Sequence, residues 1–170
     1  MDAAEAVALS RLPQGATGLI MRRIVGTGAA LLILDLASKK VVRTLMVPGQ
    51  SVPIVPGIFH LTYVLNPGAA FGLFAHMTAY FIVVAAVVIF VILAYGRILA
   101  SGSVLLELSL GLQLGGAVGN LVDRVVTGRV IDFLDFRVWP VFNFADSAIV
   151  IGVGLFACGV LFGKESAAGK

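Results

Sequence analysis

The stretch TAYFIVVAAVVIFVILAY, residues 78–95, decides the fold class of this chain. Its 18 residues include no Asp, Glu, Lys or Arg, and they lie inside a longer run without these residues, from Thr44 to Gly96. A helix of that length nearly crosses a hydrocarbon core of about 30 Å. The whole chain is 59% hydrophobic and 12% charged, with a mean hydropathy of +1.05, which is outside the range of ordinary soluble domains. The sequence therefore predicts an integral membrane protein.

Other apolar segments extend this prediction to an all-α polytopic membrane protein with four transmembrane helices. The first has the shortest uncharged stretch, from Ile24 to Leu34, so its helix must continue past Asp35 and Lys39 in order to span. We expect flexible tails over residues 1–23 and 164–170. A single membrane domain is expected over residues 24–163, with helices at about 24–44, 73–95, 103–123 and 142–162.

A small β element is predicted between the first two helices, at about residues 50–70. Pro-Gly pairs mark turns there, and apolar residues alternate in IFHLTYVL, residues 58–65, as they do in a strand. Unpaired strand edges cannot face lipid, so this element should lie at or above the membrane surface. Along the third helix, glycines recur every four residues at 111, 115 and 119, a spacing that predicts close packing of helix backbones.

The net charge of +3 and the pI of 9.4 do not indicate a nucleic-acid partner, because the basic residues flank apolar spans, as in most membrane proteins. With four spans, equal numbers of Lys and Arg fall on the two sides, so charge counting leaves the orientation open. Cys158 is the only cysteine, which excludes a disulfide or a cysteine-rich metal site within one chain. Phosphate-loop and zinc motifs are also absent from the sequence, so we expect no metal or cofactor.

Five short polar motifs lie at or close to helix ends on one side of the predicted bundle. Helices that enter and leave on that side bring these ends together, so the motifs could form one pocket at the bilayer boundary. The motifs are DLASK (35–39), NPGAAFG (66–72), GGAVGNLVDR (115–124), VIDF (130–133) and FNFAD (142–146).

Two interpretations of Asp146 compete. Asn143 followed three residues later by Asp146 resembles a capping box, which would satisfy free N–H groups at the start of the last helix. A carboxylate in an otherwise apolar run is also costly, at roughly 2.5 to 3.5 kcal/mol for a helix centre, and such residues usually have a function. Asp123 beside Arg124 can similarly be interpreted as a neutralised pair with a structural role. The same interpretation applies to Asp35 with Lys39, which lie one helical turn apart.

A second acid, Asp132, precedes Asp146 and favours a catalytic interpretation. Two neighbouring carboxylates cannot easily both ionise, so one keeps a proton while the other is charged, as aspartic proteases require. The helix N-terminus favours the anion at Asp146, and burial near lipid favours the proton on Asp132. Asp135 lies three residues from Asp132, and the sequence alone does not decide which of the two faces Asp146.

Taken together, these motifs closely resemble the lipoprotein signal peptidase family, the bacterial type II signal peptidases, which are intramembrane aspartic proteases. The resemblance runs from Asp35 to about Gly152 and implies that Asp132 and Asp146 are the catalytic pair. It further implies residues that organise the site or bind substrate, namely Asn66, Gly68, Asn120, Asp123, Arg124, Asn143 and Ala145, and residues that support it, namely Asp35, Lys39 and Phe71.

The resemblance also implies the substrate and the setting. The substrate would be a prolipoprotein whose lipobox cysteine carries diacylglycerol, cut on the N-terminal side of that cysteine, and globomycin-type inhibitors would bind the site. Both termini would lie in the cytoplasm, with the site toward the outer leaflet of the bacterial inner membrane. No metal, cofactor or nucleic acid is implied, and we expect the enzyme to act as a monomer among membrane lipids.

Two other classes of protein remain to be weighed. A transporter or proton conductor would use Asp35, Asp123 and Asp146 as a relay, but it predicts acids spread through the membrane depth and an internal repeat. Here the acids apart from Glu107 gather on one side, and no repeat is evident. A helical scaffold would explain the glycine spacing but leaves the gathered carboxylates without a purpose.

Overall fold

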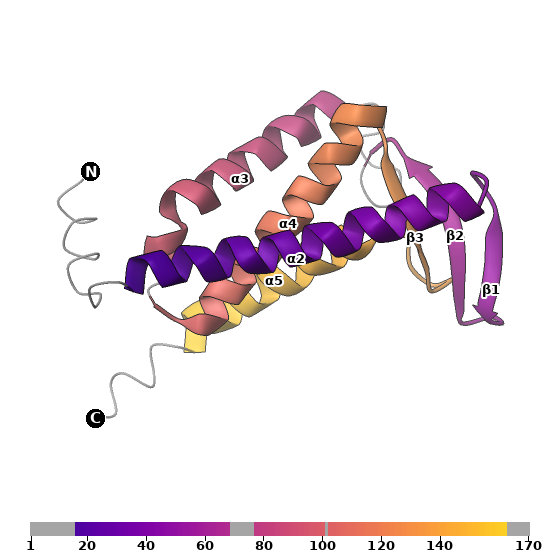
Figure 1. Cartoon of the computed structure of the whole chain (residues 1–170). Coiled ribbons are helices and arrows are strands. Elements are labelled where there is room, and N and C mark those ends of the chain that lie inside the picture. Colours follow the sequence, from indigo (N-terminus) through magenta and orange to yellow (C-terminus); the bar gives the residue numbers. More distant parts are fainter. Residues whose placement is uncertain (1–15, 69–76, 101, 163–170) are drawn as a thin grey trace.

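The computed structural model describes residues 16–68, 77–100 and 102–162. Within these residues the chain forms a helical bundle with a small antiparallel sheet at one end (Figure 1). The helices are α2 (Ala16–Leu45), α3 (Thr78–Ala100), α4 (Val104–Thr127) and α5 (Phe144–Phe162). The strands are β1 (Ser51–Val55), β2 (Phe59–Asn66) and β3 (Val130–Asp135).

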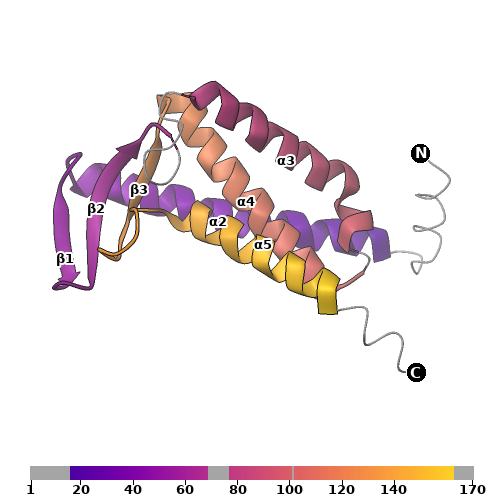
Figure 2. The ribbon, with the colours of Figure 1, turned by 180° about the vertical axis from the view of Figure 1, so that it is seen from behind.

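Helix α4 is the centre of the bundle and packs against the other three helices (Figure 2). In its most apolar 18-residue window 61% of the residues are buried, compared with 11% for α3 and 17% for α5. A helix that is surrounded by protein can carry polar side chains at membrane depth, because they face partners rather than lipid. The central position of α4 therefore explains why its polar residues can be part of a buried site.

The predicted glycine packing is confirmed. A Cβ atom at Gly111 would lie 2.6 Å from Cβ of Thr27, and one at Gly115 would lie 2.5 Å from the carbonyl oxygen of Gly28, both on α2. On the side toward α5, a Cβ atom at Gly116 would lie 2.5 Å from the carbonyl oxygen of Ala145. These glycines let α2 and α5 approach the backbone of α4 more closely than any side chain would permit.

Helices α3, α4 and α5 are long and apolar enough to cross a membrane. Helix α2 has 30 residues, but charged side chains occur along it, and it does not reach the same apolar composition.

Helix α2 begins at Ala16, so the prediction of a flexible tail over residues 1–23 is wrong for residues 16–23. The physical reason is packing: Ile20 and Ile24 are buried in a core cluster with Ile92 and Leu106. The remainder of that tail and the C-terminal tail, 164–170, lie outside the described residues.

The other helix boundaries differ from the predicted ones by a few residues. Helix α3 begins at Thr78 and ends at Ala100, five residues beyond the predicted end, because Gly96 and Ala100 are buried against the bundle. Helix α4 continues to Thr127 and stops at Gly128, whose φ of 74° is the left-handed conformation that glycine tolerates best. Residues 73–76 of the predicted second helix lie outside the described residues.

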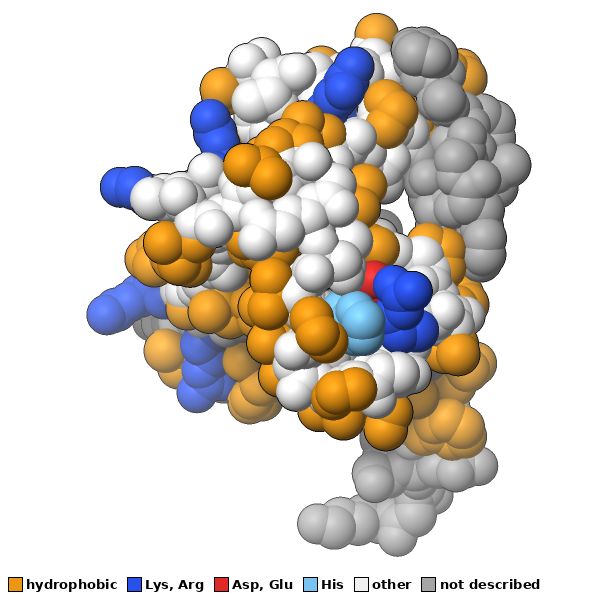
Figure 3. Space-filling view, turned by 90° about the vertical axis from the view of Figure 1, so that its right-hand side faces the viewer, with side chains coloured by type: hydrophobic (Ala, Val, Ile, Leu, Met, Phe, Trp, Pro, Cys, Tyr) orange, Lys and Arg blue, Asp and Glu red, His pale blue; other side chains and the backbone are white. Residues whose placement is uncertain are grey.

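The sheet confirms the predicted β element and adds a strand to it. Its strand order is β1-β2-β3 with both pairs antiparallel, and Asn66 of β2 lies opposite Val130 of β3. The third strand contains the VIDF motif, whose partner is more than sixty residues away in the sequence. Tyr63, Ile131 and Phe133 form the buried core beneath the sheet. Figure 3 shows this end of the molecule, where hydrophobic side chains cover much of the surface and very little acidic surface is exposed.

Candidate active site

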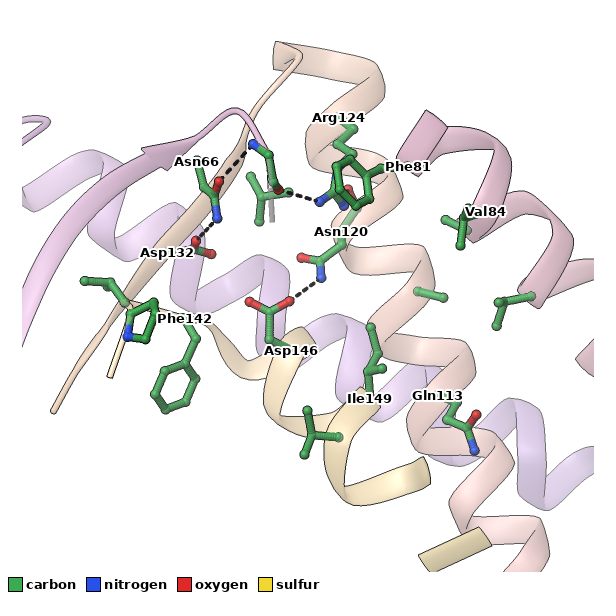
Figure 4. A pocket seen from close by; sticks show the side chains of 18 of the residues that line it. Asn66, Phe81, Val84, Gln113, Asn120, Arg124, Asp132, Phe142, Asp146 and Ile149 are labelled. Carbon is green, nitrogen blue, oxygen red and sulfur yellow. Dashed lines mark hydrogen bonds between the residues drawn. The ribbon is translucent and has the colours of Figure 1, made fainter. Parts of the chain in front are cut away.

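A cavity of about 480 Å³ lies where the sheet meets the helices (Figure 4). Asp132 of β3 and Asp146 of α5 both line it, although they come from different elements. The other polar residues in its wall include four of those expected from the sequence motifs: Asn66, Gly68, Asn120 and Arg124. The cavity therefore brings together residues from four of the five motifs.

Asp132 is 1% exposed and is held by two side-chain amides. Its Oδ2 accepts a hydrogen bond from Nδ2 of Asn66 at 2.9 Å, and its Oδ1 accepts one from Nδ2 of Asn143 at 2.7 Å. Burial and the nearby charge of Asp146 raise the pKa of Asp132 from 3.8 to about 7, although the two amides partly oppose the shift. Near neutral pH this carboxyl can therefore hold a proton.

Asp146 lies in the first turn of α5, where it takes part in a cap. Oδ1 of Asn143 accepts a hydrogen bond from the backbone N–H of Asp146 at 2.8 Å, and Oδ2 of Asp146 lies 3.4 Å from the backbone nitrogen of Asn143. This reciprocal arrangement is the predicted capping box. Nδ2 of Asn120 also donates to Oδ1 of Asp146 at 2.7 Å (Figure 4). The side chain of Asp146 therefore caps α5 and lines the cavity at the same time.

Asn143 and Asn120 connect the two acids. The carbonyl oxygen of the Asn143 side chain is occupied by the helix N-terminus, so its amide nitrogen must face the other way, toward Asp132. The same nitrogen lies 3.2 Å from Oδ1 of Asn120, whose own amide nitrogen donates to Asp146. The acids are therefore positioned by amide donors, and neither of them forms an ion pair within the described residues.

A second, fully buried group of charges lies behind the cavity. Nζ of Lys39 is 2.6 Å from Oδ2 of Asp35 and 2.9 Å from Oδ2 of Asp123. The free oxygen of Asp35 accepts the backbone N–H of Ala145 at 3.0 Å, and Oδ2 of Asp123 accepts that of Ile131 at 3.1 Å. The ion triad therefore links α2 and α4 to the residues next to both cavity acids.

The ion triad confirms one expected pair and corrects another. Asp35 and Lys39 are in contact across one helical turn, as predicted. The neutralised pair of Asp123 with Arg124 is wrong, because adjacent helical residues point in different directions. Arg124 lies over the ring of Phe81, 4.7 Å from its centroid.

Arg124 and Gly68 organise the rim of the cavity. A guanidinium nitrogen of Arg124 donates to the carbonyl oxygen of Gly68 at 3.4 Å, and the backbone N–H of Gly68 donates to Oδ1 of Asn66 at 2.9 Å. This fixes the turn after β2 against α4 and orients the amide of Asn66 toward Asp132 (Figure 4). Phe71, the remaining supporting residue, lies outside the described residues.

Asp135 has a different environment from Asp132, three residues before it on the same strand. It does not line the cavity; its Oδ2 instead accepts hydrogen bonds from Thr62 at 2.6 Å and from Arg137 at 2.9 Å. Burial raises the pKa of Asp135, but these hydrogen bonds outweigh burial and leave it below its ordinary value. Because residues three apart point to opposite faces of a strand, only Asp132 faces Asp146.

The apolar wall of the cavity was not identified from the sequence. It extends along α5 from Asp146 through Ile149, Val150 and Val153, and along α3 from Phe81 to Val88. The spacing of three, four and seven residues from Asp146 places these α5 side chains on one helix face, so this periodicity was a signal that could have found them. Val150 and Val153 are 71% and 52% exposed, so the cavity opens on the surface that would face lipid.

Among the described residues, no group of three or more His, Cys, Asp or Glu side chains is arranged to hold a metal ion. The two cavity acids instead form a pair in which one carboxyl can be protonated while the other is ionised. Such a pair can act as a general acid and a general base on the same substrate.

Comparison with known proteins gives the family. A family model described as signal peptidase (SPase) II matches residues 27–162. A lipoprotein signal peptidase of Moorella thermoacetica is 56% identical over 126 residues, which are 73% of this chain and 84% of the relative. One of Pelotomaculum thermopropionicum is 48% identical over 143 residues, which are 84% of this chain and 93% of the relative.

Solved structures agree with this result. A bacterial membrane enzyme determined by the in meso method at 2.3 Å resolution superposes with a TM-score of 0.77 and 28% identity, over 86% of this chain and 91% of that one. A second, at 1.9 Å resolution, gives a TM-score of 0.74 and 29% identity, over 81% and 92% of the two chains. With a family model that spans most of the chain and relatives that share about half of its aligned residues, this protein belongs to the signal peptidase II family of membrane peptidases.

Proposed function

We propose that this protein is an aspartic endopeptidase that removes the signal peptide from diacylglyceryl-modified prolipoproteins, cutting just before the lipidated cysteine. The observation that carries the proposal is the pairing of Asp132 and Asp146 in one cavity, where amide groups orient them. The curated relatives are named as lipoprotein signal peptidases, which supports this class of substrate.

In the proposed reaction Asp146 is the general base and Asp132 the general acid. Asp146 takes a proton from a water molecule, whose oxygen bonds to the carbonyl carbon of the scissile peptide, while Asp132 donates its proton to the carbonyl oxygen. The resulting tetrahedral diol collapses: its hydroxyl proton returns to Asp132, and Asp146 passes the first proton to the leaving nitrogen. The products are a signal peptide with a new carboxyl group and a cysteine with a free amine.

The position of each acid supports this division of roles. Asp132 has a pKa of about 7 and so carries a proton near neutral pH. Asp146 lies at the N-terminus of α5, where the helix dipole stabilises an anion. Oδ2 of Asp146 has only a long contact of 3.4 Å with a backbone nitrogen, which leaves it available to accept a proton from water.

The apolar wall of the cavity fits a substrate that stays in the membrane. Val150 and Val153 both line the cavity and face outward from α5, so acyl chains or an apolar signal peptide can contact them without leaving the bilayer. The reacting peptide bond would then meet the acids at the polar end of the same cavity. We propose the same cavity as the site for globomycin-type inhibitors.

We further propose that α2 is the fourth transmembrane span and that the sheet lies outside the bacterial inner membrane. The sheet lies at one end of the bundle, and the start of α2 and the end of α5 lie at the other (Figure 1). With this orientation both termini are cytoplasmic, and the acids lie toward the outer leaflet. The ion triad supports α2 as a span, because its buried charges are paired with each other rather than exposed to lipid.

The proposal is tested with purified full-length protein in detergent and a synthetic lipobox peptide, with and without diacylglycerol on its cysteine. Mass spectrometry of the products gives the position of the cut. We expect cleavage only before the cysteine and only of the lipidated peptide. Cleavage of the bare peptide at the same rate would contradict the proposed role of the lipid. If a folded preparation cut neither peptide, the peptidase proposal would fail, and proton conduction would be tested next.

A further inference from the structure

A second groove, of about 500 Å³, lies between α2 and α4 and is separate from the cavity that holds the two acids. Lys40 and Arg43 from the last turns of α2 line it, and Val122 and Val126 of α4 form its opposite wall. Leu36 and Val122 lie deeper along the two helices than Arg43 and Val126, since both helices run toward the sheet (Figure 1). Leu36 and Val122 therefore supply apolar surface at the deeper end, beside the paired charges of Lys39 and Asp123, and Lys40 and Arg43 make the end near the sheet basic.

The two cations at the rim have no acidic partner within the described residues. Both are exposed, and neither of their side chains takes part in a hydrogen bond or an ion pair there. Asp123 is the acidic residue that lines the groove, but it is buried and contacts Lys39 at 2.9 Å. Every Asp or Glu that the structure describes is buried or partly buried, so the surface offers Lys40 and Arg43 no anion.

The lining of the groove is complementary to the two parts of a phospholipid, its charged headgroup and its acyl chain. In the orientation proposed above, with α2 as a span and the sheet outside the membrane, the end of α2 lies at the depth of the lipid headgroups. Val126 in the groove wall is 71% exposed, so the groove opens on the outer surface of the bundle. Two adjacent cations match one phosphodiester anion, and the deeper apolar wall can contact the start of an acyl chain.

We propose that the groove between α2 and α4 is a binding site for an anionic phospholipid, with Lys40 and Arg43 holding its phosphodiester headgroup and the deeper apolar wall contacting its chain. The ligand is a lipid rather than a free anion, because the apolar side chains of Leu36, Val122 and Val126 line the groove beside the two cations. The site does not depend on the proposed peptidase chemistry, since neither cation lines the cavity of Asp132 and Asp146.

The proposal is tested by native mass spectrometry of the full-length protein in detergent, with phosphatidylglycerol or phosphatidylcholine added. We expect the wild type to retain one phosphatidylglycerol in preference to phosphatidylcholine. Because a basic side chain near a lipid surface contributes about 1 kcal/mol, Lys40→Gln and Arg43→Gln should each lower the affinity roughly fivefold, and the double variant by roughly 25-fold. Both residues are exposed, so these variants should fold.

Arg129→Gln is the matched control, because Arg129 is an exposed cation at the same end of the molecule that does not line the groove. It should change lipid retention less than twofold. An equal loss in Arg129→Gln, or equal retention of the two lipids by wild type, would show only diffuse surface attraction and overturn the proposal. Displacement of the bound lipid by millimolar inorganic phosphate would also overturn it, because it would identify a free-anion site.

Discussion

The two groups of buried acids in this protein differ in how their charge is balanced. Asp35 and Asp123 share the ammonium group of Lys39 at 2.6 and 2.9 Å, so each of these acids is in direct contact with a cation inside the protein. Asp132 and Asp146 accept hydrogen bonds from neutral amide donors and line an open cavity, where Arg124 is a nearby cation but forms no ion pair with either acid within the described residues. Burial alone therefore does not make an acid reactive. A carboxyl that lines an open cavity without an ion pair can exchange a proton with a substrate or with water, whereas the two in the ion triad are buried in contact with Lys39.

Asp146→Asn should have the largest effect on activity. Asparagine keeps the shape of the side chain and can still accept the hydrogen bond from Asn120, but it cannot take a proton from water. Loss of a general base typically lowers a rate by 10² to 10⁴, and we expect a fall of at least about a thousandfold. The measurement is cleavage of the lipidated peptide, with thermal unfolding in detergent as the check that α5 remains capped.

Lys39→Met tests the ion triad of Asp35, Lys39 and Asp123, and it should chiefly reduce the stability of the protein. It leaves Asp35 and Asp123 buried without a cation, which typically costs about 3 to 5 kcal/mol. We expect a large fall in the thermal midpoint and in the yield of folded protein. Lys40→Met is the matched control, because Lys40 is the exposed neighbour in the same helix.

A triple variant tests whether the charges of the ion triad are themselves needed for stability. Asp35→Asn and Asp123→Asn, added to Lys39→Met, remove all three charges and keep acceptors for the backbone N–H groups of Ala145 and Ile131. Much of the lost stability should return, since a buried ion group can be replaced by neutral side chains of similar volume. Failure of the triple variant to regain any stability would argue that the charges themselves have a further role.

The pH dependence of cleavage tests the pair of acids in the cavity, Asp132 and Asp146. In the proposed mechanism Asp132 must be protonated, and its pKa is about 7. Activity should therefore persist below pH 7 and fall about tenfold per pH unit above it, as the acid loses its proton. The initial rate with lipidated peptide between pH 5 and 9 provides the measurement, and a rate that rises steadily above pH 7 would contradict this assignment.

Asp135→Asn should have the smallest effect. This residue is buried near Asp132, but it contacts Thr62 and Arg137 and does not line the cavity. Its ion pair with the half-exposed Arg137 contributes at most about 1 kcal/mol. Cleavage by this variant should stay within about threefold of wild type, and a dead Asp135→Asn enzyme would mean that the wrong strand acid has been assigned.

Several of these features could be predicted from the sequence because they depend on local patterns. Apolar length identified three helices, α3, α4 and α5, that are able to cross a membrane, and the glycine spacing identified the tight contacts of α4. The Asn143 to Asp146 spacing predicted the cap that the structure contains. Each of these signals lies within one segment of the chain.

The remaining features depend on contacts between distant segments. Val130–Asp135 becomes a strand because it pairs with β2, and this pairing decides that Asp132, rather than Asp135, faces the cavity. Similarly, Asp123 pairs with Lys39 from another helix, not with the adjacent Arg124. Helix α2 begins at Ala16 because Ile20 and Ile24 are buried against other helices, which a single segment cannot reveal.

The most direct test of the catalytic pair is the rate at which Asp132→Asn cleaves the lipidated peptide. The protein must first be shown to be folded by its thermal midpoint and by its elution in detergent. Asparagine keeps one acceptor for the amides of Asn66 and Asn143, so the variant loses one hydrogen bond together with the proton that Asp132 would donate. If Asp132 is the general acid, the rate should be at least about a hundredfold below that of wild type. A folded Asp132→Asn protein that cleaves at more than about a tenth of the wild-type rate would contradict the assignment of this residue as the general acid.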